Sequence, residues 1–123
     1  MEKEFIPYDL ALELKELGFN EPCFGFYNRK EKLYLCDYKN ANEEKISIIS
    51  APLYQQAFRF FREKYGLHYI ICKNIQMDGY GYREVILIPY MEENENTIFK
   101  TYEEAEVECL VKLIEIAKEQ NVK

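Results

Sequence analysis

The chain has 123 residues, of which 48% are apolar and 31% are charged, and this composition predicts a single globular domain over residues 1–123. The apolar share, together with 8 Phe and 11 Tyr, excludes an intrinsically disordered chain, and no stretch reaches the roughly 20 apolar residues of a membrane-spanning helix. The net charge of −6 has the wrong sign for a protein that holds nucleic acid non-specifically, so nucleic acid is an unfavoured partner.

The first helix is predicted over about Tyr8 to Leu17, and it ends at Gly18, a residue that readily adopts the left-handed conformation of a helix C-terminus. A second helix is predicted after Ser50-Ala51-Pro52, because Ser can cap a helix and Pro is tolerated in its first turn. This helix ends at Gly66. Its aromatic and small residues recur every three or four positions and are expected to pack on a sheet: Tyr54, Ala57, Phe58, Phe61 and Tyr65.

A third helix is predicted from Thr101 to about Glu119. Thr101 and Glu104 have the spacing of a capping box, in which the hydroxyl accepts from a free backbone amide and the carboxylate reaches back. This helix has two apolar stripes. One is expected to lie on the sheet and comprises Tyr102, Ala105, Cys109, Leu113 and Ile116.

The second stripe of this helix comprises Val107, Val111 and Ile114. Three branched apolar side chains along one line are seldom left in water, because each is stabilised by burial. Two explanations remain open for this stripe. Another helix of the same chain covers it, or it meets its own copy in a symmetric homodimer.

Between the helices the apolar pattern alternates with a period of two, which indicates strands. Strands are predicted at Cys23 to Tyr27 and at Lys32 to Tyr38, joined by a four-residue connection, with a brief strand at Ile46 to Ile49. A second pair is predicted at Leu67 to Lys73 and Tyr80 to Ile88, ended by Pro89. The stretch Glu92 to Asn96 is predicted to be a solvated loop.

The element order is therefore α-β-β-(β)-α-β-β-α, and the fold class is α+β: an antiparallel sheet of four or five strands with three helices, mainly on one face. The pattern Tyr-x-x-Ala near the start of each helix is consistent with an internal duplication of an α-β-β unit, and equally with chance. It occurs at Tyr8 and Ala11, at Tyr54 and Ala57, and at Tyr102 and Ala105.

No set of residues with the spacing of a catalytic, metal or cofactor site is found, so we expect a non-enzymatic protein without cofactor. The four cysteines, Cys23, Cys36, Cys72 and Cys109, form no C-x-x-C pair and are expected to be buried thiols in a reducing cytoplasm. Residues 1–7 lack the basic start and apolar run of a signal peptide, which also favours the cytoplasm. His68 and Cys72 would lie about 13 Å apart on one strand, beyond hydrogen-bond reach.

Tyr80, Tyr82 and Arg83 lie close together in sequence, and exposed aromatic residues beside a basic one can stack single-stranded bases. Whether they form a binding surface, or only the rim of a hairpin, is left open. A second alternative follows from the net charge: an acidic protein can imitate DNA.

Three segments carry a resemblance to other proteins: residues 5–24, 51–67 and 101–116. The chain resembles, over nearly its whole length, a group of short uncharacterised proteins common in bacteriophages and mobile elements of gut bacteria. The resemblance implies a compact bacterial or prophage protein but no activity, cofactor or catalytic residue. The favoured hypothesis is therefore a small interaction module that binds an unknown protein partner, as an adaptor or as an inhibitor of a host protein. The alternatives are a nucleic-acid-binding accessory protein and the acidic DNA mimic.

Overall fold

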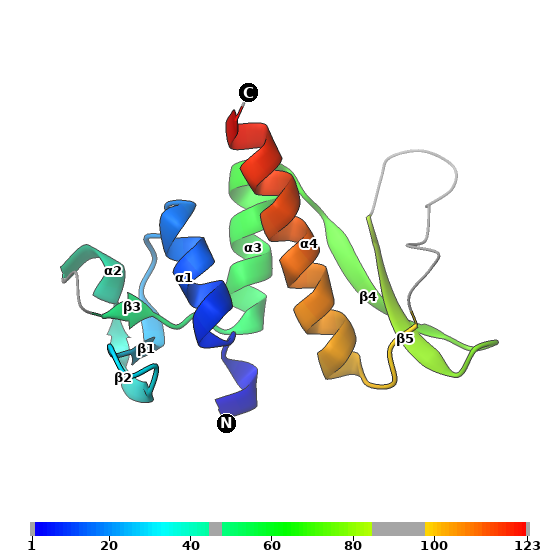
Figure 1. The fold of residues 1–123 in the computed structure, drawn as a ribbon, viewed down its shortest axis with the longest axis horizontal. Coiled ribbons are helices and arrows are strands. Elements are labelled where there is room, and N and C mark those ends of the chain that lie inside the picture. Colours follow the sequence, from blue (N-terminus) through cyan, green and yellow to red (C-terminus); the bar gives the residue numbers. More distant parts are fainter. Residues whose placement is uncertain (1, 45–47, 85–97, 123) are drawn as a thin grey trace. The chain divides into compact units, whose positions relative to one another are not determined.

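The computed structural model describes residues 2–44, 48–84 and 98–122 (Figure 1). The chain forms two compact units, Met1–Phe60 and Phe61–Asn121. The helix α3 (Tyr54–Tyr65) begins in the first unit and ends in the second.

In its described residues the first unit contains a three-stranded antiparallel sheet, a short 3-10 helix and two further α-helices. A short 3-10 helix, η1 (Glu2–Glu4), and α1 (Tyr8–Glu16) precede the hairpin of β1 (Cys23–Tyr27) and β2 (Leu33–Lys39). The single-turn helix α2 (Ala41–Glu44) then leads to β3 (Ile49–Ser50), and the strand order is β2-β1-β3. All the paired strands of this sheet are antiparallel.

The end of α1 has the hydrogen bonds of a Schellman motif. Gly18 has φ 92°, its amide donates to the carbonyl of Lys15, and the amide of Phe19 donates to that of Leu14. The predicted stop at Gly18 is confirmed. This turn directs Phe19 into the core, where its ring lies edge-on to that of Phe60 at 5.4 Å.

The inner face of β1 consists of Cys23, Gly25 and Tyr27, all buried. Phe5 packs closely over this face, because a Cβ atom at Gly25 would lie 3.0 Å from its ring. The Tyr27 hydroxyl donates to the carbonyl of Ile6 at 2.7 Å, which ties the N-terminal segment to the strand. The core of this unit therefore lies between β1, α1 and the N-terminal segment.

The second unit contains the end of α3, the hairpin of β4 (Tyr69–Asn74) and β5 (Gly79–Glu84), and α4 (Tyr102–Val122). The hairpin is paired from Tyr69↔Glu84 to Asn74↔Gly79. Phe99 forms an antiparallel bridge to Tyr80, with hydrogen bonds of 2.7 and 2.8 Å in the two directions. The buried residues of α4 are Ala105, Cys109, Leu110, Leu113, Ile114 and Ala117.

The structure confirms the α+β class and the order of the elements, and one feature of the sheet differs. In the described parts of the chain five strands form two antiparallel sheets, of three and of two strands, where a single sheet of four or five is expected from the sequence. Helix α2 is not predicted either, because four residues are too few to show a helical period. Of the expected strand from Ile46 to Ile49, residues 46 and 47 lie outside the described residues, and β3 is Ile49–Ser50.

The described part of β5 ends at Glu84. The expected continuation to Ile88, the stop at Pro89 and the loop from Glu92 to Asn96 lie outside the described residues.

The predicted face of α3 has five residues, of which three are buried and two are only half-buried. Tyr54, Ala57 and Phe61 are buried, but Phe60 is buried where Phe58 was expected, and Phe58 is half-buried. Tyr65 is half-buried as well. Neighbouring residues of a helix, such as Phe60 and Phe61, lie about 100° apart around its axis. Because both are buried, the buried surface of α3 is wider than a single stripe.

Candidate functional site

The structure does not bring Tyr80, Tyr82 and Arg83 onto one surface. Tyr80 and Tyr82 share a face of the hairpin, whereas Arg83 pairs with Ile70 on the opposite face. The Tyr82 ring stacks on Phe99 at 6.5 Å and 18°. All three residues are half-buried.

The other rings on this face of the hairpin also pack on their neighbours. Tyr80 is edge-on to Tyr102 at 6.1 Å, and Tyr69 lies 6.1 Å from Tyr82. Burial raises the pKa of Tyr69 to about 12 and raises that of Tyr82. Packing within the unit therefore explains these tyrosines, as expected if they form the rim of a hairpin and not a binding surface.

The cysteines are free thiols, and the structure divides them into two pairs. Cys23 and Cys109 are fully buried, and burial raises the pKa of each thiol to about 12. Cys36 and Cys72 are only half-buried, so the expectation of four buried thiols is wrong for these two. His68 is exposed beside the start of β4.

Neither a metal-ligand cluster nor a membrane-spanning helix occurs in the described residues. Among residues 2–44, 48–84 and 98–122, no group of three His, Cys, Asp or Glu side chains could hold a metal ion. No helix in the same segments is long and apolar enough to cross a membrane.

The stripe of Val107, Val111 and Ile114 is not an open apolar line. Ile114 is only 4% exposed, and Val107 and Val111 are half-buried. One chain therefore already covers Ile114, and the two explanations, cover by another helix of the chain and a homodimer, remain predictions.

A group of exposed and half-buried aromatic side chains lies on the outer face of the first hairpin, and we name it the aromatic face. It consists of Phe24 and Phe26 from β1 and Tyr34 and Tyr38 from β2. The rings form two contacts across the strands, Phe24 with Tyr38 at 4.8 Å and Phe26 with Tyr34 at 5.6 Å. Phe24, Tyr34 and Tyr38 remain 48%, 41% and 52% exposed.

The local sequence explains why these rings are outside. In Cys23-Phe24-Gly25-Phe26-Tyr27 the residues on one side are small or short except for Tyr27, and this is the side that Phe5 approaches. This face is not predictable from the sequence, because both sides of β1 are apolar and periodicity cannot choose between them.

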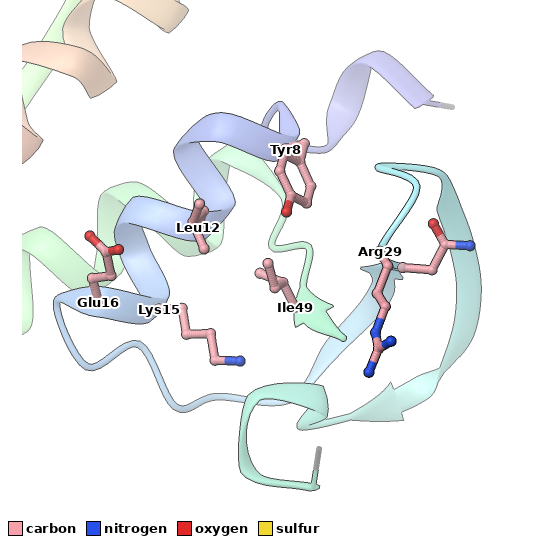
Figure 2. A pocket seen from close by; sticks show the side chains of 7 residues that line it. Tyr8, Leu12, Lys15, Glu16, Arg29 and Ile49 are labelled. Carbon is pink, nitrogen blue, oxygen red and sulfur yellow. The ribbon is translucent and has the colours of Figure 1, made fainter. Parts of the chain in front are cut away.

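A second feature of the first unit is an open hollow of about 630 Å³ (Figure 2). One face of α1 forms a wall of it, and the opposite wall comes from the end of the β1–β2 hairpin and from β3. The lining residues are Tyr8, Leu12, Lys15, Glu16, Asn28, Arg29 and Ile49. The sequence analysis did not predict this hollow, because its two walls are distant in sequence.

The two walls of the hollow are fixed by hydrogen bonds and ring contacts. The Asn28 side-chain oxygen accepts from the amides of Lys30 and Lys32, both at 3.0 Å, which holds the turn that carries Arg29. On the opposite wall Tyr8 lies edge-on to Tyr27 at 5.5 Å.

Comparison of the chain with protein-family models, with curated proteins and with solved structures found no match.

Proposed function

We propose that this protein is a small non-enzymatic interaction module that binds a protein partner through the aromatic face of its first hairpin. The observation that carries the proposal is the exposure of Phe24, Tyr34 and Tyr38 on one continuous face. Aromatic residues are enriched at the centres of protein interfaces, where they supply large contact areas at a small loss of side-chain entropy.

The strand β2 adds a second means of contact beside the aromatic face. Within the described residues β2 pairs only with β1, so it forms one edge of the three-stranded sheet. Leu35, in the middle of this edge, is 61% exposed. This edge of seven residues, which also contains Asp37 and Lys39, pairs with no further strand in the described part of the chain, and it can accept an extended segment of another chain whose backbone then completes the ladder.

The non-enzymatic part of the proposal is supported by the state of the buried thiols. A cysteine nucleophile acts as a thiolate, and a pKa of about 12 keeps Cys23 and Cys109 protonated at neutral pH. The resemblance to short phage and mobile-element proteins adds a setting in the bacterial cytoplasm, where an adaptor or an inhibitor would act on a host protein.

A second candidate function uses the same face. Lys32 lies with its Nζ atom 5.6 Å from the centre of the Tyr34 ring, so a positive charge borders an aromatic platform. Single-stranded nucleic acid binds to surfaces of this kind by stacking its bases on the rings.

The test is capture from a bacterial lysate with quantitative mass spectrometry, using two double variants. Phe24→Ser with Tyr38→Ser removes two rings from the aromatic face. Ile75→Ser with Met77→Ser removes a similar exposed apolar area at the tip of the β4–β5 hairpin, where these residues are 89% and 64% exposed. We expect a partner that is retained by wild type and by the tip variant and lost by the face variant.

A captured protein that both double variants lose equally would contradict a specific role for the aromatic face. A fluorescent 15-nucleotide oligothymidine, titrated with the wild type and monitored by anisotropy, tests the second candidate. Binding that the face variant abolishes would replace the protein partner with single-stranded nucleic acid.

A further inference from the structure

The hollow of the first unit brings together two cations in a chain of net charge −6. Lys15 comes from the last turn of α1 and Arg29 from the β1–β2 turn, and Figure 2 shows both side chains directed into the hollow. Among the residues that the structure describes, neither cation forms an ion pair with a carboxylate. We propose that this hollow binds a small aromatic phosphate monoester, with its phosphate between Lys15 and Arg29.

Hydrogen bonds of the β1–β2 turn hold the backbone around Arg29. The Asn28 amide donates to the carbonyl of Lys32 at 3.1 Å, and the Glu31 amide donates to that of Asn28 at 3.0 Å. Together with the bonds to the Asn28 side chain, these fix the backbone on both sides of Arg29. The fixed backbone places the start of the Arg29 side chain beside the hollow (Figure 2), and its planar guanidinium can form two parallel hydrogen bonds to phosphate oxygens.

Lys15 is held on the opposite wall. Its carbonyl accepts from the Gly18 amide in the Schellman motif, and its Nζ atom donates to the carbonyl of Ile48 at 3.4 Å. This bond uses one of the three donors of the ammonium group, so two remain for an anion. Glu16, the acidic residue of the described lining, directs its carboxylate away from both cations (Figure 2).

The remaining lining favours a ligand with a flat apolar body over a bare phosphate ion. Tyr8, Leu12 and Ile49 form an aromatic and aliphatic surface beside the two cations. The volume of about 630 Å³ lies in the range of small-molecule sites and far exceeds the size of inorganic phosphate. A molecule that contains both an aromatic ring and a phosphate matches both parts of the lining. Phenyl phosphate joins the two directly, and a mononucleotide joins them through a sugar.

The proposal is tested by titrating the isotope-labelled full chain with phenyl phosphate and recording amide NMR spectra. We expect saturable shifts at the amides of Leu12, Lys15, Arg29 and Ile49, with a Kd of about 1 mM or below. Inorganic phosphate and phenol, each carrying one half of the probe, should bind at least about tenfold more weakly. Adenosine 5′-monophosphate is the second probe, and shifts at the same amides would extend the site to nucleotides.

Arg29→Gln and Lys15→Gln should each weaken phenyl phosphate binding about tenfold, because each removes a charge-assisted hydrogen bond. The matched control is Lys30→Gln, which removes an exposed charge from the same turn but does not line the hollow; its effect should stay within about twofold. The spectra of the variants without ligand report whether each is folded.

The proposal is overturned by the absence of a saturable shift with phenyl phosphate, by equal affinity for inorganic phosphate, or by an equal loss in Lys30→Gln and Arg29→Gln. Equal loss would mean that the basic turn attracts anions without a site. Benzoate binding as tightly as phenyl phosphate would replace the phosphate with a carboxylate and overturn the assigned class. None of these results depends on the aromatic face, whose rings do not line the hollow.

Discussion

Gly25 decides which face of β1 is buried, and with it the position of the aromatic face. A Cβ atom at this position would lie 3.0 Å from the Phe5 ring, 3.2 Å from a Leu33 methyl group and 3.3 Å from the Tyr34 carbonyl oxygen. Glycine therefore lets the N-terminal segment pack against the strand. Phe24 and Phe26 point to the other side as a consequence.

We predict that Gly25→Ala destabilises the protein more than Phe24→Ser does, although it adds only one methyl group. The methyl group would overpack a closed site, at a cost of about 1–3 kcal/mol in the free energy of unfolding. Phe24→Ser changes a half-exposed ring and should cost less than about 1 kcal/mol. Urea titrations of both variants provide the comparison, and a larger loss in Phe24→Ser would show that the aromatic face is part of the core.

The two classes of cysteine predict two rates of thiol modification. At pH 8 the half-buried Cys36 and Cys72 should react with a thiol reagent well before the buried Cys23 and Cys109, and all four should react quickly in denaturant. Peptide mass spectrometry after timed quenching identifies the modified positions. Early modification of Cys109 would contradict its burial in the second unit.

The raised thiol pKa values also predict a dependence of stability on pH. The pKa of Cys109 is about 12 in the folded protein against an ordinary value of 9.0, so folding favours the protonated thiol. The contribution of the buried Cys109 thiol to the free energy of unfolding is fully present below pH 9 and declines as the pH rises from 9 toward 12. The free energy of unfolding should therefore fall over this window, and it should fall less steeply in Cys109→Ala than in the wild type.

At the scale of the element, α3 shows how helical spacing can give most of a face and still miss a residue. The helix begins at Tyr54, where the Gln56 side-chain oxygen accepts from the amide of Leu53 at 3.1 Å, and ends at Gly66, which has φ 67°. Between these limits Phe60 packs edge-on to Phe19, a residue of the loop that follows α1. That contact comes from outside the helix, so the period of α3 does not contain it.

We predict that Phe60→Ala and Phe61→Ala each lower the free energy of unfolding by about 3–5 kcal/mol, as expected for removal of a buried ring. Phe58→Ala should cost clearly less because its side chain is half-buried, and Arg62→Ala, at an exposed position, should be nearly neutral. Denaturant titration of the four variants gives the order. A larger effect of Phe58 than of Phe60 would restore the face that the sequence predicts.

At the scale of the whole molecule, the burial of Ile114 bears on the number of copies in solution. A side chain that is 4% exposed within one chain leaves little surface for a symmetric contact through Val107, Val111 and Ile114. We therefore expect light scattering to find a monomer at about 100 μM, a concentration at which specific dimers are populated.

The matched variants are Ile114→Glu and Val107→Glu. The first would bury an unpaired charge and should strongly destabilise the chain, whereas the second changes a half-buried position and should be tolerated better. Circular dichroism during thermal unfolding measures both. A wild-type dimer that Ile114→Glu converts to a folded monomer would establish the homodimer instead.

Local chemistry in the sequence was sufficient to predict the class, the order and most limits of the elements. Gly18 and Gly66 end helices because both have positive φ, and Thr101 begins one because its hydroxyl accepts from the Glu104 amide at 3.1 Å. These interactions span only a few residues. A single sequence therefore contains all the information that they require.

The tertiary structure decided how the strands are grouped and which side of each element is covered. The five strands form two sheets because β1 pairs with β2 and β3, and β4 with β5, choices that alternation alone does not specify. Phe5 covers the Gly25 side of β1 and leaves Phe24 outside, while α1 and a distant turn place Lys15 and Arg29 in one hollow. Both candidate sites depend on contacts between segments remote in sequence, and the periodicity of a single element carries no record of such contacts.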